Sequence, residues 1–347
     1  MRRSARRAGC TPSPPLPPSR LPDATPTSTA PPSPAPRNKL WVGVQIVVTA
    51  VVLWFVGVKL VDQWRKFRGT PLEVHPRWGF IALSCVVVLA TYAVLIETWR
   101  RMVIAWGGEL AFRDAASIWF VSTLVRYVPG NTVVQVGAFA ELARRRRVPP
   151  ATAAGAAAIN TVVAIATGFV IALLAGWRSI ERLSHGKSTL YLVAAIALLA
   201  GLLLLPTLMP ALLRGIRRVT RRSLPIGVLP RRAVYQSLTG NVIAWGLYGV
   251  AFQLFAYGVL GAARGTTLDY VAAWAAAYVI GYLALAMPAG LGVRELAQAD
   301  ALTMLGLATA GQALTIAVTA RLWLTLLELL PALFYLARGT RPRDPAP

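Results

Sequence analysis

The chain contains few of the residues that build metal sites and hydrolytic centres. Its 347 residues include two cysteines and two histidines. Cys10 lies in a polar tail and Cys85 in an apolar segment, which argues against a disulfide and excludes a thiolate metal site. His75 and His185 lie singly in loops, without the neighbouring ligands that a metal ion needs. The sequence also lacks a glycine-rich phosphate loop. We therefore expect no metal, no cofactor and no catalytic residue, and we expect that the chain is not an enzyme.

Charged residues are scarce as well, and acidic residues are the scarcest. Only 14% of the residues are charged, and 13 Asp and Glu face 36 Lys and Arg, for a net charge of +23. A hydrophobic content of 56% and a mean hydropathy of +0.57 exclude a soluble domain of this size. The arginines cluster at the ends of apolar segments, as topology signals do, so nucleic acid is not the expected partner. The class is a polytopic membrane protein with lipids as partners.

Long apolar segments define the domain organisation. Residues 1–39 are rich in Pro, Ser, Thr and Arg, and predict a disordered cytoplasmic arm. Residues 40–338 form the expected integral membrane domain, and residues 339–347 a short basic tail. Uninterrupted spans of about 20 residues or more are predicted at 40–60, 78–99, 151–177, 189–213, 239–260 and 309–337.

Two further apolar regions are interrupted by turns. The first has arms at 115–127 and 131–143 around Pro129 and Gly130. Each arm has about 13 residues, or about 20 Å of helix, which is too short to cross a bilayer. The second region has arms at 268–287 and 291–307, and its turn contains Pro288, Gly290 and Gly292.

The two interrupted regions form a weak internal repeat. An offset of 159 residues places Pro129 on Pro288 and Glu141 on Asp300 without a gap. Interrupted apolar segments at matching places are typical of transporter cores built from repeats. The predicted fold is therefore all-α: a membrane helix bundle of two inverted repeats, about 40–188 and 189–338. Each repeat contains a re-entrant helix pair that is broken by Pro and Gly.

Arginine and lysine placement predicts the topology. If each broken region returns to the side it left, a cytoplasmic N-terminus puts 24 basic residues inside and 9 outside. The remaining three of the 36 Lys and Arg residues, Arg126, Arg294 and Arg321, lie at membrane depth. The positive-inside rule favours this arrangement, although the basic loop at 59–77 is then external. Both termini are predicted to be cytoplasmic, and the two repeats to be inverted.

Cysteine labelling tests this topology. The expected result is that cysteines placed at Ser4 and at Ser223 are both labelled from the cytoplasmic side, because both lie in strongly basic segments. Labelling of either position from outside would contradict the inverted arrangement.

Ionisable residues at membrane depth are the candidate site residues, because such residues are costly there and are mostly functional. Arg294 and Glu295 either line a hydrated cavity, with Arg294 on an anionic headgroup, or cap a helix start. Arg126 and Glu141 are their counterparts, unless Arg126 extends to the surface. Arg321 needs an acidic partner, and we predict that it faces Glu295 or Asp300 inside the bundle. The predicted substrate path comprises Arg126, Pro129, Gly130, Glu141, Pro288, Gly290, Gly292, Arg294, Glu295, Asp300, Arg321 and Glu328.

Two segments carry a family resemblance. Residues 287–307, MPAGLGVRELAQADALTMLGL, and residues 319–329, TARLWLTLLEL, resemble the transmembrane region of the lysylphosphatidylglycerol synthases, also called flippase-like domain proteins. The family pattern is a turn rich in Pro and Gly, a Glu, a Gly that ends the helix, and an Arg in the last span. Its positions here are Pro288, Gly290, Gly292, Glu295, Gly306 and Arg321.

The resemblance extends over roughly residues 40–340. Tyr127 to Gly130 match the first half of the same pattern, while Ala289 replaces a usual glycine. The soluble aminoacyl-transfer domain of the full-length synthases is not expected in this chain. The resemblance implies the lipid-translocating half: a bacterial inner-membrane, flippase-like protein that handles an anionic or aminoacylated phospholipid or another lipid-linked substrate.

Two alternatives stay open at this point. The chain could be a non-transporting membrane scaffold for a cell-envelope glycosyltransferase or lipid-modifying enzyme, or an intramembrane enzyme acting on a lipid-linked phosphate. Cavity shape separates transport from scaffolding. A lateral opening lined by Arg294, Glu295 and Arg321 favours transport, whereas a closed, dry core favours a scaffold.

Overall fold

The computed structural model describes residues 76–125, 131–146, 148–177, 230–262, 264–284, 290 and 292–338, with scattered residues between 189 and 215. The N-terminal arm, the first span at 40–60 and the basic tail from 339 lie outside the described residues. Most of the span predicted at 189–213 lies outside them too.

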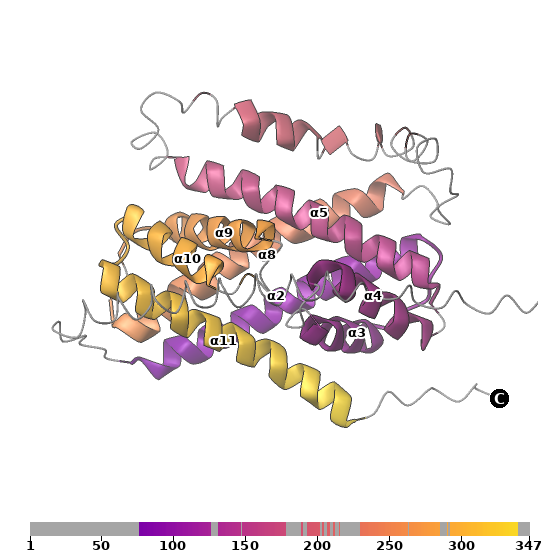
Figure 1. The fold of residues 1–347 in the computed structure, drawn as a ribbon, viewed down its shortest axis with the longest axis horizontal. Helices are drawn as coiled ribbons and strands as arrows, with labels where there is room; N and C mark the ends of the chain where they lie inside the picture. Colours follow the sequence, from indigo (N-terminus) through magenta and orange to yellow (C-terminus); the bar gives the residue numbers. More distant parts are fainter. Residues whose placement is uncertain are drawn as a thin grey trace, which may run out of the picture. The chain divides into compact units, whose positions relative to one another are not determined.

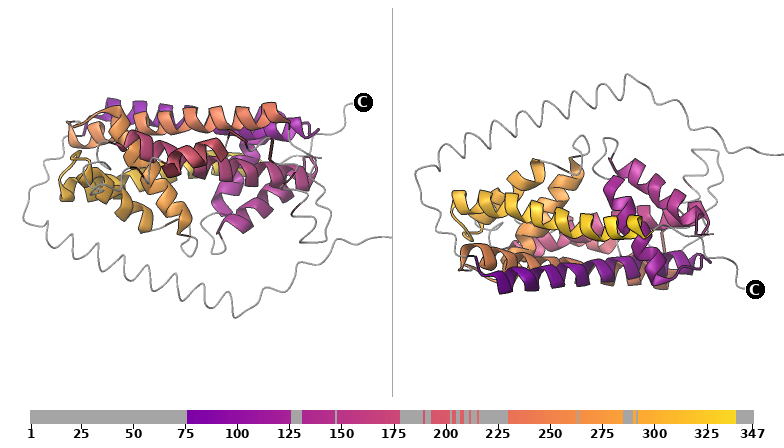
Figure 2. Two further views of the ribbon diagram at one scale, coloured as in Figure 1. Left: turned by 90° about the horizontal axis from the view of Figure 1, so that it is seen from above. Right: turned by 90° about the horizontal axis from the view of Figure 1, so that it is seen from below.

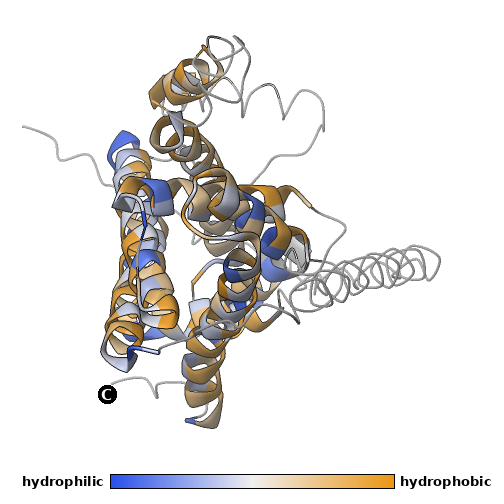
Figure 3. Ribbon diagram, turned by 90° about the vertical axis from the view of Figure 1, so that its left-hand side faces the viewer, coloured by the Kyte–Doolittle hydropathy of each residue, from blue (hydrophilic) through white to orange (hydrophobic). Residues whose placement is uncertain are grey.

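The described residues form helices and contain no strand. Four of the helices are long and apolar enough to cross a membrane, namely α2, α5, α8 and α11, and hydrophobic residues predominate along the ribbons (Figure 3). The helices, shown in Figure 1, are α2 (Trp78–Ala105), α3 (Phe112–Val125), α4 (Asn131–Arg144), α5 (Pro150–Ala175), α8 (Arg231–Leu260), α9 (Thr267–Leu283), α10 (Val293–Met304) and α11 (Ala310–Ala337).

Two helices are longer than the apolar pattern predicted. Helix α8 begins at Arg231 rather than near 239, because Pro230 is its N-cap and the polar first turns continue the helix outside the apolar stretch. Helix α2 continues to Ala105 rather than ending near 99. Its polar end is stabilised locally, since Arg100 and Arg101 both pair with Glu97 at 2.7 Å.

Helices α2 and α8 pack along one another in antiparallel orientation and form the most extensive helix–helix contact among the described elements. Glycines on α8 allow the close approach. A Cβ atom at Gly240 would lie 2.1 Å from the hydroxyl of Thr98, and one at Gly258 would lie 2.6 Å from Ile81. Small residues at such contacts let helices approach closely in lipid, where packing takes the place of the hydrophobic effect.

Gly249 provides a test of this packing. A Cβ atom there would lie 2.1 Å from Cγ2 and 2.7 Å from the Cα atom of Val271 on α9, whereas one at Gly246, on the same helix, would meet nothing within 4 Å. Gly249→Ala is expected to lower the free energy of unfolding by about 1–3 kcal/mol through overpacking. Gly246→Ala is expected to be neutral or slightly stabilising, because alanine favours helix. Thermal unfolding in one detergent measures both, and equal midpoints would refute the close contact.

Two pairs of shorter helices lie in the two regions of the chain that were predicted to be interrupted. Helices α3 and α4 have 14 residues each, and α9 and α10 have 17 and 12. In the chain, the pair α3–α4 lies between α2 and α5. The N-terminal end of α3 therefore lies near the C-terminal end of α2, and the C-terminal end of α4 lies near the N-terminal end of α5. The pair α9–α10 lies between α8 and α11 at the opposite end of the bundle. The inner ends of the two pairs lie close together in both views of Figure 2.

The helix contacts are paired across the bundle. Helix α5 packs against α4 and α9, while α11 packs against α10 and α3. Helix α2 packs against α3 as α8 packs against α9. Exchanging α2 with α8, α3 with α9, α4 with α10 and α5 with α11 therefore reproduces the main contacts. The offset of 159 residues that aligns Pro129 with Pro288 also aligns each of these helices with its counterpart in the sequence.

Most of the described arginines lie at one end of the bundle, here called the basic end. Helix α11 runs parallel to α2, because Trp323 contacts Cys85 and Glu328 contacts Tyr92. The C-terminal ends of α2 and α11 therefore lie beside the N-terminal end of α8. The described arginines of the basic end are Arg100, Arg101, Arg113, Arg144, Arg145, Arg146, Arg231, Arg232 and Arg338, and those of the opposite end are Arg77 and Arg264.

Candidate functional site

The turn before α10 explains two of the predicted glycines. Gly290 and Gly292 have φ angles of +65° and +81°, in the region that residues with a Cβ rarely adopt. Gly292 directly precedes α10, and its N–H donates to Oε2 of Glu295 at 2.6 Å. Glu295 thus satisfies a backbone donor at the helix start, where a negative charge is also favoured by the helix dipole.

Glu295 also pairs with Arg321, as the sequence predicted. Its Oε1 lies 3.3 Å from Nε of Arg321, and each side chain is one-tenth exposed. The N–H direction does not meet hydrogen-bond geometry, so the contact is an ion pair. One carboxylate therefore holds the start of α10 and a cation of α11 together.

Arg294 is held between two aromatic rings of α9. Its guanidinium carbon lies 4.7 Å from the ring centre of Trp274 and 4.6 Å from that of Tyr278, and the residue is 6% exposed. Both distances are within the range of cation–π attraction, which is strong away from water. Gly281 makes room for the Arg294 side chain, because a Cβ atom at Gly281 would lie 2.7 Å from the Cβ of Arg294.

The structure separates the remaining candidates. Glu141 is exposed at the end of α4 and pairs with Arg144 at 2.9 Å. Asp300 is exposed on α10, so Arg321 takes Glu295 as its partner instead. The candidates Arg126, Pro129, Gly130 and Pro288 lie outside the described residues.

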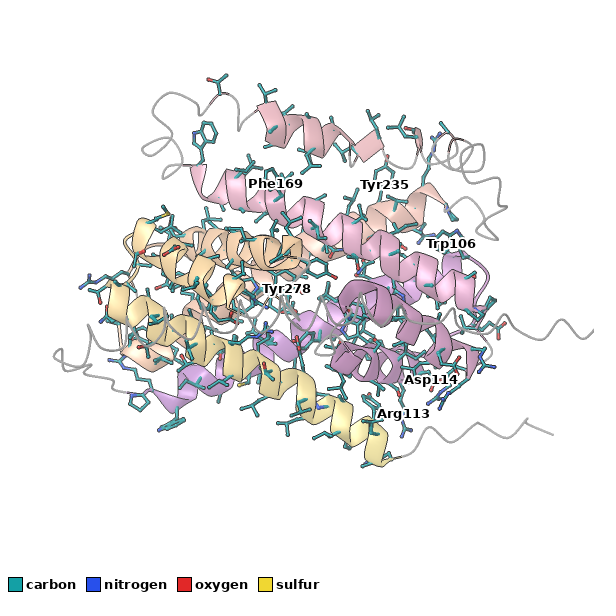
Figure 4. The ribbon with its side chains drawn as sticks, viewed as in Figure 1. Trp106, Arg113, Asp114, Phe169, Tyr235 and Tyr278 are labelled. Atoms are coloured by element: carbon teal, nitrogen blue, oxygen red, sulfur yellow. The ribbon has the colours of Figure 1, made fainter. Side chains whose placement is uncertain are left out.

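Glu328 lies in the interior, at a cavity of about 100 Å³ between the two helix pairs. The residue is 3% exposed, and its Oε1 accepts a hydrogen bond of 2.9 Å from the hydroxyl of Tyr92. Tyr278, labelled in Figure 4, projects from α9 near the middle of the bundle. The cavity is lined by Tyr92, Leu95, Trp119, Thr123, Gln135, Phe139, Ala157, Asn160, Thr161, Ala164, Ile165, Asn241, Tyr248, Tyr278, Tyr282 and Glu328.

Most of the predicted charged residues lie outside this lining. The sequence left two interpretations open for Arg294 and Glu295, the lining of a hydrated cavity or the cap of a helix start, and neither they nor Arg321 belongs to the lining of this cavity. Their side chains are occupied by the aromatic rings, the backbone of Gly292 and one another. Buried charges in an apolar bundle are stable only with such partners. Of the predicted residues that the structure describes, Glu328 is the one that reaches the cavity.

A buried amide cluster lies beside the cavity. Oδ1 of Asn160 accepts hydrogen bonds from Ser237 at 3.0 Å and from Asn241 at 3.1 Å, and Asn241 also donates to the carbonyl oxygen of Ser237 at 2.8 Å. Asn160 and Gln253 both bond between helices, and Gln253 accepts its hydrogen bond from Thr267 at 2.8 Å. The side-chain amide of Gln298 differs, because its Nε2 makes no hydrogen bond within the described part of the chain.

The cavity is equipped for binding by hydrogen bonds and ring contacts. Asn160, Asn241, Gln135 and Thr161 supply polar groups from α4, α5 and α8, in a bundle whose exterior is largely apolar. Among the described residues, no three His, Cys, Asp or Glu side chains group as metal ligands. The geometry thus fits a small polar group.

The comparison with protein families gives one match. Residues 41–332 match the lysylphosphatidylglycerol synthase TM region. The matched range includes the four long helices almost entirely, both helix pairs and the cavity between them. The search of curated proteins finds no match.

Proposed function

Because the chain belongs to the family of the lysylphosphatidylglycerol synthase TM region, we propose that it is a flippase-like protein that binds a phospholipid or lipid-linked headgroup and moves it between leaflets. The cavity between the two helix pairs is the observation that carries this proposal. It places amide, hydroxyl and aromatic groups inside an apolar bundle, where polar groups are costly unless they bond. In this proposal the chain moves lipid and catalyses no chemical change.

The paired helix contacts support an inverted-repeat path. The exchange of α2–α5 with α8–α11 relates the two halves, and the pairs α3–α4 and α9–α10 approach from opposite ends (Figure 2). We take these pairs as re-entrant hairpins that meet near the middle of the bilayer. Broken helices that meet in this way form the substrate sites of many secondary transporters.

The basic end gives the proposed orientation. By the positive-inside rule, the end with Arg100, Arg144 and Arg231 faces the cytoplasm of a bacterial inner membrane. Its exposed arginines would attract anionic lipid to that surface. Arg113 and Asp114, both labelled in Figure 4, lie at this end at the start of α3.

Leaflet-resolved lipid labelling tests the proposal. The purified protein is placed in liposomes with a trace of fluorescent phospholipid, and a membrane-impermeant reductant bleaches the outer leaflet. The expected result is bleaching beyond the outer-leaflet fraction in proteoliposomes but not in protein-free liposomes. Bleaching that stops at the outer leaflet in both would contradict transport of that lipid.

One observation favours the second candidate, a scaffold for a cell-envelope enzyme. Arg294, Glu295 and Arg321 are buried against protein groups, and their contacts join α9, α10 and α11. Such contacts are expected in a rigid scaffold as well as in a transport path. A protein without leaflet activity that co-purifies with an envelope enzyme would support this alternative.

A further inference from the structure

We propose that the start of α10 holds a buried site for a small monovalent anion such as chloride, between α9, α10 and α11. Three side chains form it: Trp274 on α9, and Arg294 and Gln298 on α10, which are 1%, 6% and 2% exposed. None of the three lines the cavity between the helix pairs. The site is therefore separate from the proposed lipid path, and it stands whether or not the protein moves lipid.

Two nitrogen donors at this site have no acceptor. Nε1 of Trp274 and Nε2 of Gln298 make no hydrogen bond with any residue that the structure describes. Most buried polar groups are hydrogen-bonded, because a buried donor without an acceptor loses the bonds that it made to water. Two such donors in one region indicate a ligand that accepts hydrogen bonds, either a water molecule or an anion.

Arg294 brings the two donors to one place. Its guanidinium carbon lies 4.7 Å from the ring centre of Trp274. Gln298 follows Arg294 by four residues in α10, which puts the two side chains on the same face of the helix. Side chains in a helix lean toward its N-terminus, so the amide of Gln298 extends toward Arg294. Both donors thus lie beside the same cation.

The charges at the start of α10 favour an anion over a water molecule. Arg294 and Arg321 are cations, and Glu295, which is engaged by Arg321, is the one acid beside them, so one positive charge is in excess. Glu328, the next buried acid, lies at the cavity, about 10 Å further along α11. A helix start also favours negative charge. A water molecule could accept from both donors but would leave the excess charge unbalanced.

Burial favours a free ion of atomic size over a phosphate on a lipid. A Cβ atom at Gly281 would lie 2.7 Å from the Cβ of Arg294, so α9 packs closely against the base of this side chain. The rings of Trp274 and Tyr278 cover its guanidinium. A halide needs only the donors and the nearby charge, whereas a phosphate needs room for several oxygen atoms.

Thermal unfolding of the full-length protein in detergent tests the site. Chloride replaces gluconate, a much larger anion, in steps at constant ionic strength. Because an ion that binds the folded state stabilises it by mass action, we expect the unfolding midpoint to rise by about 2–4 °C as chloride saturates the site. Equilibrium dialysis with radioactive chloride measures the binding directly, and we expect saturable retention by the protein.

Two variants remove one donor each. Trp274→Phe removes Nε1 and keeps an aromatic ring beside Arg294, whereas Gln298→Leu removes Nε2. Each is expected to raise the chloride concentration that gives half of the shift by about tenfold or more, which corresponds to the loss of a hydrogen bond to a charged group. Nε2 of Gln298 has no protein acceptor to lose, so Gln298→Leu carries the test if Trp274→Phe fails to fold.

Gln253→Leu is the matched control, because it removes a partly exposed amide that accepts from Thr267. A chloride response that Gln298→Leu or Trp274→Phe weakens and Gln253→Leu keeps would support the site, even if no lipid crosses between leaflets. A wild-type midpoint that is equal in chloride and gluconate, without bound chloride, would overturn it, since water alone would then satisfy the donors. A response that both site variants keep would also overturn it, because the ion would then bind elsewhere, as at the exposed arginines of the basic end.

Discussion

Replacing Arg321 with alanine is expected to lower the free energy of unfolding by about 3–5 kcal/mol, because it leaves the carboxylate of Glu295 buried without this cation. The two side chains are each one-tenth exposed, and their charged atoms lie 3.3 Å apart. The double variant Arg321→Ala with Glu295→Gln is expected to be less destabilised than Arg321→Ala alone. It removes the buried charge, and its amide oxygen can still accept from Gly292.

An exposed arginine provides the matched control. Arg144 pairs with Glu141 at 2.9 Å, and its side chain is 65% exposed. Exposed pairs contribute little, so Arg144→Ala should leave the unfolding free energy close to that of the wild type. Denaturant or thermal unfolding in detergent measures all three variants. If Arg321→Ala is as mild as Arg144→Ala, or if the double variant is worse than the single one, the buried pair is not a stabilising contact.

Gly290→Ala is expected to be the most damaging glycine substitution near the site. Its φ of +65° disfavours any side chain, and its Cβ would lie 2.6 Å from the carbonyl oxygen of Gly281. A collision with backbone atoms cannot be relieved by a rotamer change. Overpacking of about 1–3 kcal/mol therefore adds to backbone strain of about 1–3 kcal/mol. The turn that positions Glu295 and Arg294 would shift, and both stability and leaflet exchange should fall.

Gly306, on the far side of α10, isolates the steric part. It has a similar φ of +69°, but a Cβ there would meet nothing within 4 Å. Gly306→Ala therefore incurs the strain without the collision, and its unfolding midpoint should lie between those of the wild type and Gly290→Ala. Equal midpoints for the two variants would mean that the contact with Gly281 is not tight.

The apolar pattern predicted the described helices well because length and hydropathy dominate in membranes. The described helices α3 and α4 lie on either side of Pro129 in the sequence, α9 and α10 lie on either side of Pro288, and the ends of α2 and α8 differ from the expected ones for local polar reasons. The pair of Arg321 and Glu295 could be predicted because the chain has few acids. A cation at membrane depth then has few possible partners.

The cavity could not be predicted because its lining, Glu328 apart, is uncharged and comes from helices far apart in sequence. Asn160 and Asn241 carry no motif, and their contact follows only from the packing of α5 against α8. Sequence reasoning followed charges and left Arg294 either on an anionic headgroup or at a helix cap, whereas the rings of Trp274 and Tyr278 enclose it. Polar residues inside predicted spans, such as Asn160, were the available signal.

The central claim is that lipid passes through the cavity between the two helix pairs, and a cavity-filling variant tests it most directly. Ala164 lines the cavity, whereas Val162 on the same helix is 58% exposed. Leaflet exchange is measured in liposomes for Ala164→Phe and Val162→Phe at equal protein content, with thermal unfolding as a check of folding. The expected result is that Ala164→Phe falls to the rate of protein-free liposomes, while Val162→Phe keeps the wild-type rate. A folded Ala164→Phe protein that exchanges lipid at the wild-type rate would contradict the claim.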